Sequence, residues 1–203
     1  MEESGAAGGP TISLGDRLSR VRASLQESEY LELMPPATER AVADFEDRFA
    51  LQLPPMFRAF TLEVGDGIHS EDGDHFLFGL DRIALEVAAD GGRPSQPFWY
   101  TNEQTSAFLD AMQRIPKDGS VWENEDLSEL QKIGALDGCL TVADHGCADY
   151  SVLVVTGEQA GFMWRTGEID VPDIREVWEI ELRGTGTTPL DFLSWLELYA
   201  GIR

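Results

Sequence analysis

The sequence has few cysteines and no long apolar run. Its two cysteines, Cys139 and Cys147, are too few for a disulfide framework. No stretch approaches the roughly 18 apolar residues that a membrane-spanning helix requires. The first ten residues have neither a basic start nor an apolar segment, which argues against a secretory signal. These absences predict a cytoplasmic protein with reduced thiols and no membrane association.

Basic residues are also scarce. The 203 residues include 15 Lys and Arg against 37 Asp and Glu, a net charge of −22. Direct nucleic-acid binding requires Lys and Arg to displace phosphate counterions, so this balance argues against it. A surface this acidic instead attracts basic proteins and speeds encounter with them. Solubility alone is an alternative explanation for the charge.

Sequence motifs of common enzyme classes are missing as well. The chain has no Gly-x-x-x-x-Gly-Lys-Ser/Thr phosphate loop, no Gly-x-Ser-x-Gly nucleophile elbow and no His-Glu-x-x-His helix. We therefore predict no enzymatic activity, no catalytic residue, no metal and no cofactor.

The most informative feature that is present lies in residues 138–165. Two apolar runs flank the turn His145-Gly146-Cys147, and a third apolar run begins at Gly161. Short apolar runs joined by tight turns predict a β-meander at the centre of the fold. In an extended strand, alternate side chains project from one face, so this pattern predicts that five side chains lie on the same face of the strand. That set is Cys139, Thr141, Ala143, His145 and Cys147.

The His145-Gly146-Cys147 turn has two interpretations. In the structural one, Gly146 provides the backbone conformation, Cys147 is a small apolar filler, and His145 bonds to a neighbouring strand. In the chemical one, His145 and Cys147 serve a metal site or a Cys–His hydrolase. A metal site needs three or four ligands, and a nucleophile needs a base oriented by a third group. We favour the structural interpretation.

Helical periodicity frames the meander. The apolar spacing from residue 12 predicts an amphipathic helix, and Thr38 is a good N-cap for a second one. Pro54 and Pro55 form an elbow before a third helix, which we expect Gly65 to end in the left-handed conformation. Further predictions are a strand at 76–80, a strand or helix at 83–89, a helix at 105–115, a strand at 177–182 and a closing helix at 189–200.

This order of elements predicts the α+β class. We expect a mixed or antiparallel sheet with the meander at its centre, and two N-terminal helices and a C-terminal helix packed on it. Residues 1–11 are predicted to be a disordered tail, 12–33 a helical extension, and 34–203 the main α+β domain.

Two acidic segments are candidate partner-binding surfaces. The first contributes Asp66, Glu71, Asp72 and Asp74. Its glycine comes too early for an EF-hand calcium loop, and weak cation binding or a solvated loop are alternatives. The second surrounds an aromatic residue with carboxylates, the composition of a hot spot for a basic partner, although a buried tryptophan beside a solvated helix start also fits. Its residues are Trp122, Glu123, Glu125, Asp126 and Glu129.

Three pieces of the sequence, in order, resemble the SUKH superfamily. They are residues 36–67 with the Leu53-Pro54-Pro55 elbow, residues 140–164 with the His145-Gly146-Cys147 turn, and the closing segment 192–196. The resemblance runs from about residue 34 to the C-terminus and is thin between about 83 and 136. Ala148 stands where bacterial relatives often carry another glycine.

The resemblance implies a non-catalytic α+β module. Bacterial members of the family neutralise toxin domains, often nucleases or deaminases, and fungal members regulate cell-wall assembly through protein interactions. We therefore expect a module that binds a cognate, basic toxin domain, with a regulatory scaffold as the alternative. The residues expected to be structural are Pro54, Gly65, His145, Gly146, Cys147, Gly157, Gly161, Trp164 and Trp195.

Overall fold

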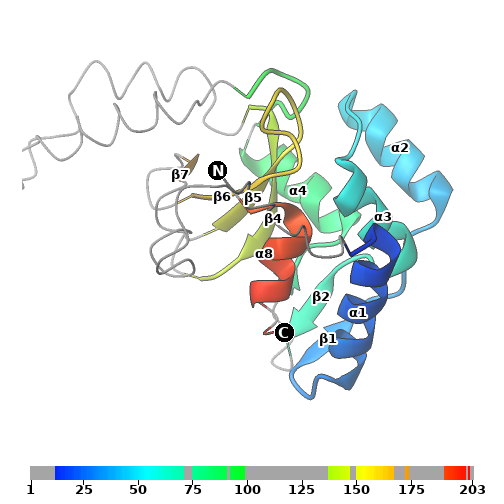
Figure 1. The fold of residues 1–203 in the computed structure, drawn as a ribbon. Helices are drawn as coiled ribbons and strands as arrows, with labels where there is room; N and C mark the ends of the chain where they lie inside the picture. The colour runs from blue at the N-terminus through cyan, green and yellow to red at the C-terminus, as the bar shows by residue number, and fades with distance from the viewer. Residues whose placement is uncertain are drawn as a thin grey trace, which may run out of the picture.

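The computed structural model describes residues 12–70, 75–90, 92–98, 137–146, 150–166, 172–173, 190–199 and 201. Helices and antiparallel strands share this part of the chain, which confirms the predicted α+β class (Figure 1). The predicted tail, the helix at 105–115 and the strand at 177–182 lie outside the described residues.

The described strands form two antiparallel sheets. The first has the order β1-β2-β3, and its strands are β1 (Leu31–Leu33), β2 (Ile68–Ser70) and β3 (His75–Leu77). The second has the order β4-β5-β6-β7, and its strands are β4 (Cys139–Asp144), β5 (Tyr150–Val154), β6 (Met163–Thr166) and β7 (Pro172–Asp173). Strands β4, β5 and β6 are the predicted meander. The separate first sheet was not predicted.

A β-bulge in β4 decides which of its side chains face the core. Thr141 pairs with Val152 and Ala143 pairs with Ser151, so Val142 is the extra residue. Both Val142 and Ala143 join the hydrophobic core. The prediction of one shared face is therefore wrong, because the bulge shifts the alternation by one residue. Cys139 and Thr141 lie on the face opposite Ala143 and His145, and Cys147 lies outside the described residues.

The bulge is also where the two sheets meet. Immediately after β3, the Phe78 N–H donates to the Val142 carbonyl at a distance of 2.7 Å. This bond gives the carbonyl of the extra residue a partner inside the fold, as buried backbone groups require.

Five helices lie in the described part of the chain. They are α1 (Leu14–Glu27), α2 (Glu39–Phe49), α3 (Pro55–Glu63), α4 (Leu80–Asp90) and α8 (Phe192–Tyr199). The Thr38 hydroxyl accepts from the Ala41 N–H at 3.1 Å, which confirms the predicted N-cap of α2. The ambiguous segment 83–89 belongs to α4 and is helical.

Aromatic packing joins α3 to α8 at the centre of the core. The Phe192 ring packs edge-on against Phe57, with centroids 5.0 Å apart, and its centroid lies 5.4 Å from that of Phe60. Trp195 is fully buried and stacks on Phe192 at 6.2 Å. The apolar face of α1 belongs to the same core, so residues from both ends of the chain are buried together.

An ion-pair cluster fastens α1 to α8 at the edge of this core. Arg17 reaches the Glu197 carboxylate at 3.1 Å, and Arg20 reaches it at 2.7 Å. Arg17 also contacts Asp191 and donates to the Ser194 hydroxyl. Burial opposes ionisation of Glu197, but the two guanidinium groups outweigh it and lower the pKa of its carboxyl below the ordinary value of about 4.5.

Replacing Glu197 by Gln is expected to lower the free energy of unfolding by about 1 kcal/mol at neutral pH. Because the folded-state pKa of Glu197 is lowered, the cluster stabilises the fold above the ordinary carboxyl pKa, and this contribution disappears as the pH falls through the lowered value. Urea unfolding of Glu197→Gln and the parent chain from neutral to acidic pH should show curves that converge in acid. The control is Glu158→Gln, at an exposed position. A loss of stability that does not change with pH would contradict the ionic origin.

Candidate partner-binding groove

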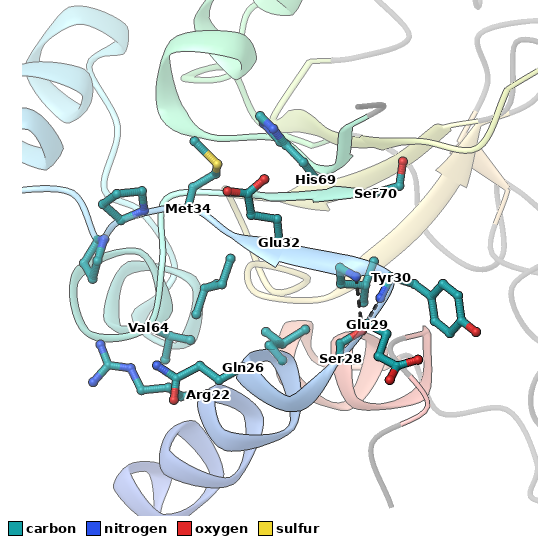
Figure 2. Close-up of a pocket in the computed structure, with 15 residues that line it drawn as sticks. Arg22, Gln26, Ser28, Glu29, Tyr30, Glu32, Met34, Val64, His69 and Ser70 are labelled. Atoms are coloured by element: carbon teal, nitrogen blue, oxygen red, sulfur yellow. Dashed lines mark hydrogen bonds between the residues drawn. The ribbon is translucent and has the colours of Figure 1, made fainter. Parts of the chain in front are cut away.

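An open groove runs along β1, between the C-terminal half of α1 and strand β2 (Figure 2). It has a volume of about 730 Å³. Its walls include Arg22 and Gln26 from α1, Tyr30 and Glu32 from the β1 segment, and His69 from β2. The loop predicted to bind a partner, 66–74, passes along this groove as β2, and its residues 71–74 lie outside the described part.

Ser28 turns the chain from α1 directly into β1. Its backbone is extended, and its N–H donates to the Leu25 carbonyl at the helix end. The Ser28 hydroxyl accepts from the N–H groups of Tyr30 and Leu31 at 3.2 and 3.1 Å. One side chain therefore satisfies two backbone donors at the start of the strand and fixes the angle between helix and strand.

Gly65 lies where β1 packs closely on the chain, and this contact, not a left-handed conformation, is what requires glycine there. It does not take the left-handed conformation that we expected; in this turn the positive φ, 107°, belongs to Gly67. A Cβ atom at Gly65 would clash with Leu33 Cδ1 and lie 2.6 Å from the Met34 carbonyl oxygen. The absence of a side chain at Gly65 therefore lets β1 pack closely against the end of α3.

We expect Gly65→Ala to reduce the free energy of unfolding by about 1–3 kcal/mol, because the added methyl group must displace β1. Gly15→Ala is the matched control. Gly15 lies in α1, where an added Cβ atom would meet no other part of the chain within 4 Å, so this variant should gain up to about 1 kcal/mol from helix propensity. Thermal and urea unfolding of both variants test this. Equal stability of Gly65→Ala and the parent would show that β1 does not need the close approach.

Asp66, a predicted partner-binding residue, has an internal role. Its carboxylate accepts from the Leu80 N–H at 2.8 Å and so caps the N-terminus of α4. Burial raises the pKa of Asp66 above its ordinary value of about 3.8, the Leu80 hydrogen bond lowers it, and the nearby Asp81 charge adds to the increase. The first sheet is thereby fastened to α4.

Two substitutions separate the hydrogen bond of Asp66 from its charge. Asp66→Ala should lower the free energy of unfolding by about 1 kcal/mol through loss of the cap. Asp66→Asn keeps an acceptor oxygen and should be far less destabilising. Because the folded-state pKa is raised, the parent chain is most favoured relative to Asp66→Asn below about pH 3.8 and loses that advantage as the pH rises through the raised value. Urea unfolding across this range measures it; an Asn variant as unstable as the Ala variant would contradict this.

The His145-Gly146 turn closes the β4–β5 hairpin. The His145 Nε2 lies 2.8 Å from the Ser151 hydroxyl, and the Gly146 N–H donates to the Asp144 carboxylate at 2.7 Å. A His–Ser pair at this distance has the spacing of a base and a nucleophile, but Ser151 is fully buried, which keeps a substrate from its hydroxyl. Among the described residues, no three His, Cys, Asp or Glu side chains gather to hold a metal ion.

The other predicted structural residues lie around the meander. Gly157 and Gly161 bracket the turn between β5 and β6, and Pro54 packs beside Gly161. Trp164 is fully buried on the meander face opposite the main core, where its ring centroid lies 5.2 Å from that of Phe98. The predicted partner-binding residues outside the described part are Glu71, Asp72, Asp74, Trp122, Glu123, Glu125, Asp126 and Glu129.

Sequence reasoning missed the acidic residues of the groove. Glu29, Tyr30 and Glu32 are all exposed, and Tyr30 retains 69% of its accessible surface. Neither glutamate forms an ion pair with a described residue. The local signal is limited to the three-residue alternation Leu31-Glu32-Leu33 before the two prolines, which is too short to identify a strand.

The arginine side chains in the described part make their contacts within the chain, although several of them are largely exposed. Every arginine whose side chain is described has a partner within the chain. The partners are carboxylates for Arg17, Arg20, Arg40, Arg58, Arg82 and Arg93, the Glu63 carbonyl for Arg22, and the Phe49 ring for Arg48. The unpaired surplus on the described surface is therefore acidic.

No protein-family model matches this chain, and a comparison with curated proteins likewise gives no match. The resemblance to the SUKH superfamily rests on the sequence motifs described above. In the described part of the chain, no helix combines the length and the apolar character needed to cross a membrane.

Proposed function

We propose that this chain is a SUKH-type protein-binding module that neutralises a cognate toxin domain by covering a basic surface on it. It acts by stoichiometric binding and transforms no substrate. The observation that carries the proposal is the division of charge: the described arginines are engaged internally, and unpaired carboxylates face solvent.

A surface of this kind suits a target that itself binds a polyanion. A nuclease or nucleic-acid deaminase needs Lys and Arg along the path of the phosphate backbone. An acidic protein competes for those same groups, and the opposite net charges speed the encounter. The net charge of −22 therefore favours a toxin of this class over one that acts on a membrane or on a small neutral substrate.

Two independent features support the proposal. Three motifs that resemble the SUKH superfamily follow one another in order from about residue 34 to the C-terminus, with little resemblance between about 83 and 136. The described strands and helices form an α+β arrangement with antiparallel sheets, the class that the resemblance implies.

Co-expression tests the function directly. A toxin domain encoded beside this gene should kill cells when expressed alone, and should become harmless and copurify with this chain when the two are expressed together. A neighbouring toxin that stays lethal, with no complex in the purified fraction, would contradict the proposal. A complex with a cellular enzyme, and no toxin encoded nearby, would support the regulatory scaffold instead.

A further inference from the structure

We propose that the partner docks by adding an extended, basic segment to the outer edge of β1, as a further strand of the first sheet. The inference rests on the proposed function and specifies its site. The groove supplies the space, β1 supplies the backbone groups, and the carboxylates of Glu29 and Glu32 supply the selectivity.

The backbone of β1 is open on the groove side. Among the described strands β1 pairs with β2 alone, and the Met34 N–H donates to the Gly67 carbonyl at 3.1 Å just beyond the paired residues. Bonded and non-bonded pairs alternate along an antiparallel ladder, so the backbone groups of Leu31 and Leu33 point away from β2. The Leu31 N–H already donates a hydrogen bond to the Ser28 hydroxyl. No described residue bonds to the Leu31 carbonyl or to either backbone group of Leu33, so these groups can pair with an added strand.

The side chains around this edge favour a basic occupant. Glu29 and Glu32 are exposed, and Tyr30 is an exposed aromatic residue between them that can serve as an anchor. Among the described residues that line the groove, Arg22 is the one Arg or Lys, and it donates to the Glu63 carbonyl at the end of α3. Lys or Arg side chains on an added strand would lie beside these carboxylates, and opposite charges on neighbouring strands favour pairing.

The same charges exclude a second copy of this chain. Pairing β1 with β1 of another molecule would bring glutamates together on both strands, and two chains of charge −22 repel each other. Acidic residues on a short edge strand are a known protection against self-association. A foreign basic strand meets no such barrier.

A peptide titration followed by NMR tests the docking edge on the full chain. The probe is an acetylated and amidated Lys-Val-Lys-Val-Lys peptide, and its matched control is the same sequence with N-methylated backbone amides, which keeps the charge and removes the donors. We expect the unmethylated peptide to shift the Leu31 and Leu33 amide signals, to slow hydrogen exchange at Leu33, and to bind about tenfold more tightly than the control. Equal binding of the two peptides, or shifts confined to other strands, would overturn the proposal.

Reversing the charge of Glu29 and Glu32 tests whether these two carboxylates select a basic peptide. Glu29→Lys/Glu32→Lys should weaken peptide binding about tenfold, whereas Asp44→Lys/Asp47→Lys, which changes the net charge equally on exposed positions of α2 away from β1 (Figure 1), should leave it nearly unchanged. All four positions are exposed, and thermal unfolding verifies that both variants fold. Equal weakening by the two variants would show unspecific attraction and overturn the docking edge.

The same variants separate this inference from the function on which it rests. In co-expression with the toxin domain, Glu29→Lys/Glu32→Lys should lose protection and Asp44→Lys/Asp47→Lys should keep it. If both variants protect as well as the parent chain, the docking edge is refuted while the neutralising function stands. If the parent chain itself gives no protection, the function fails, and the peptide titration still decides whether β1 accepts a strand.

Discussion

The repulsion among 22 uncompensated negative charges is the constraint under which this fold forms. Self-repulsion of this size opposes compactness, so the position of each positive charge matters. Arg17 and Arg20 join the first helix to the last through Glu197, and Arg93 reaches the buried Asp137 across a long stretch of sequence. These pairs connect segments distant in sequence, whereas Arg40–Asp44 and Arg82–Glu86 each lie within one helix. Because the described arginines are used in contacts within the chain, the charge left over on the described surface is negative.

The geometry of the groove follows from a few local requirements. Ser28 turns the chain out of α1, and Gly65 lets β1 lie against the end of α3. Asp66 then anchors α4 to the turn before β2. Each of these residues holds the backbone in place. The side chains of Ser28 and Asp66 are used in hydrogen bonds within the chain, and Gly65 has no side chain. The residues suited to binding are the exposed ones on and beside β1, which are Glu29, Tyr30 and Glu32.

Helices and long strands could be predicted from the sequence because their signals are local. Thr38 caps α2 and Pro55 begins α3 where the pattern placed them, and the meander followed from three apolar runs. Strands of three residues, such as β1 and β2, have too little periodicity to stand out. The bulge at Val142 and the close contact at Gly65 depend on neighbours distant in sequence, so the predictions of a single strand face and a left-handed Gly65 were wrong.

The candidate site was harder to predict than the fold for the same physical reason. An acidic run in a sequence does not show which carboxylates form hydrogen bonds within the fold. Asp66 caps α4, whereas Glu29 and Glu32 are exposed to solvent. Edge position is a property of the assembled sheet. The groove along β1 therefore emerges only when α1, β1 and β2 are placed together (Figure 2).

Titration of toxin activity against the purified chain is the most direct test of a binding function. If the chain acts by covering its partner, activity falls linearly and reaches zero at one equivalent, and the inhibition weakens as salt is added. Complete inactivation by a small fraction of an equivalent, progressing with time, would instead reveal turnover and contradict the account.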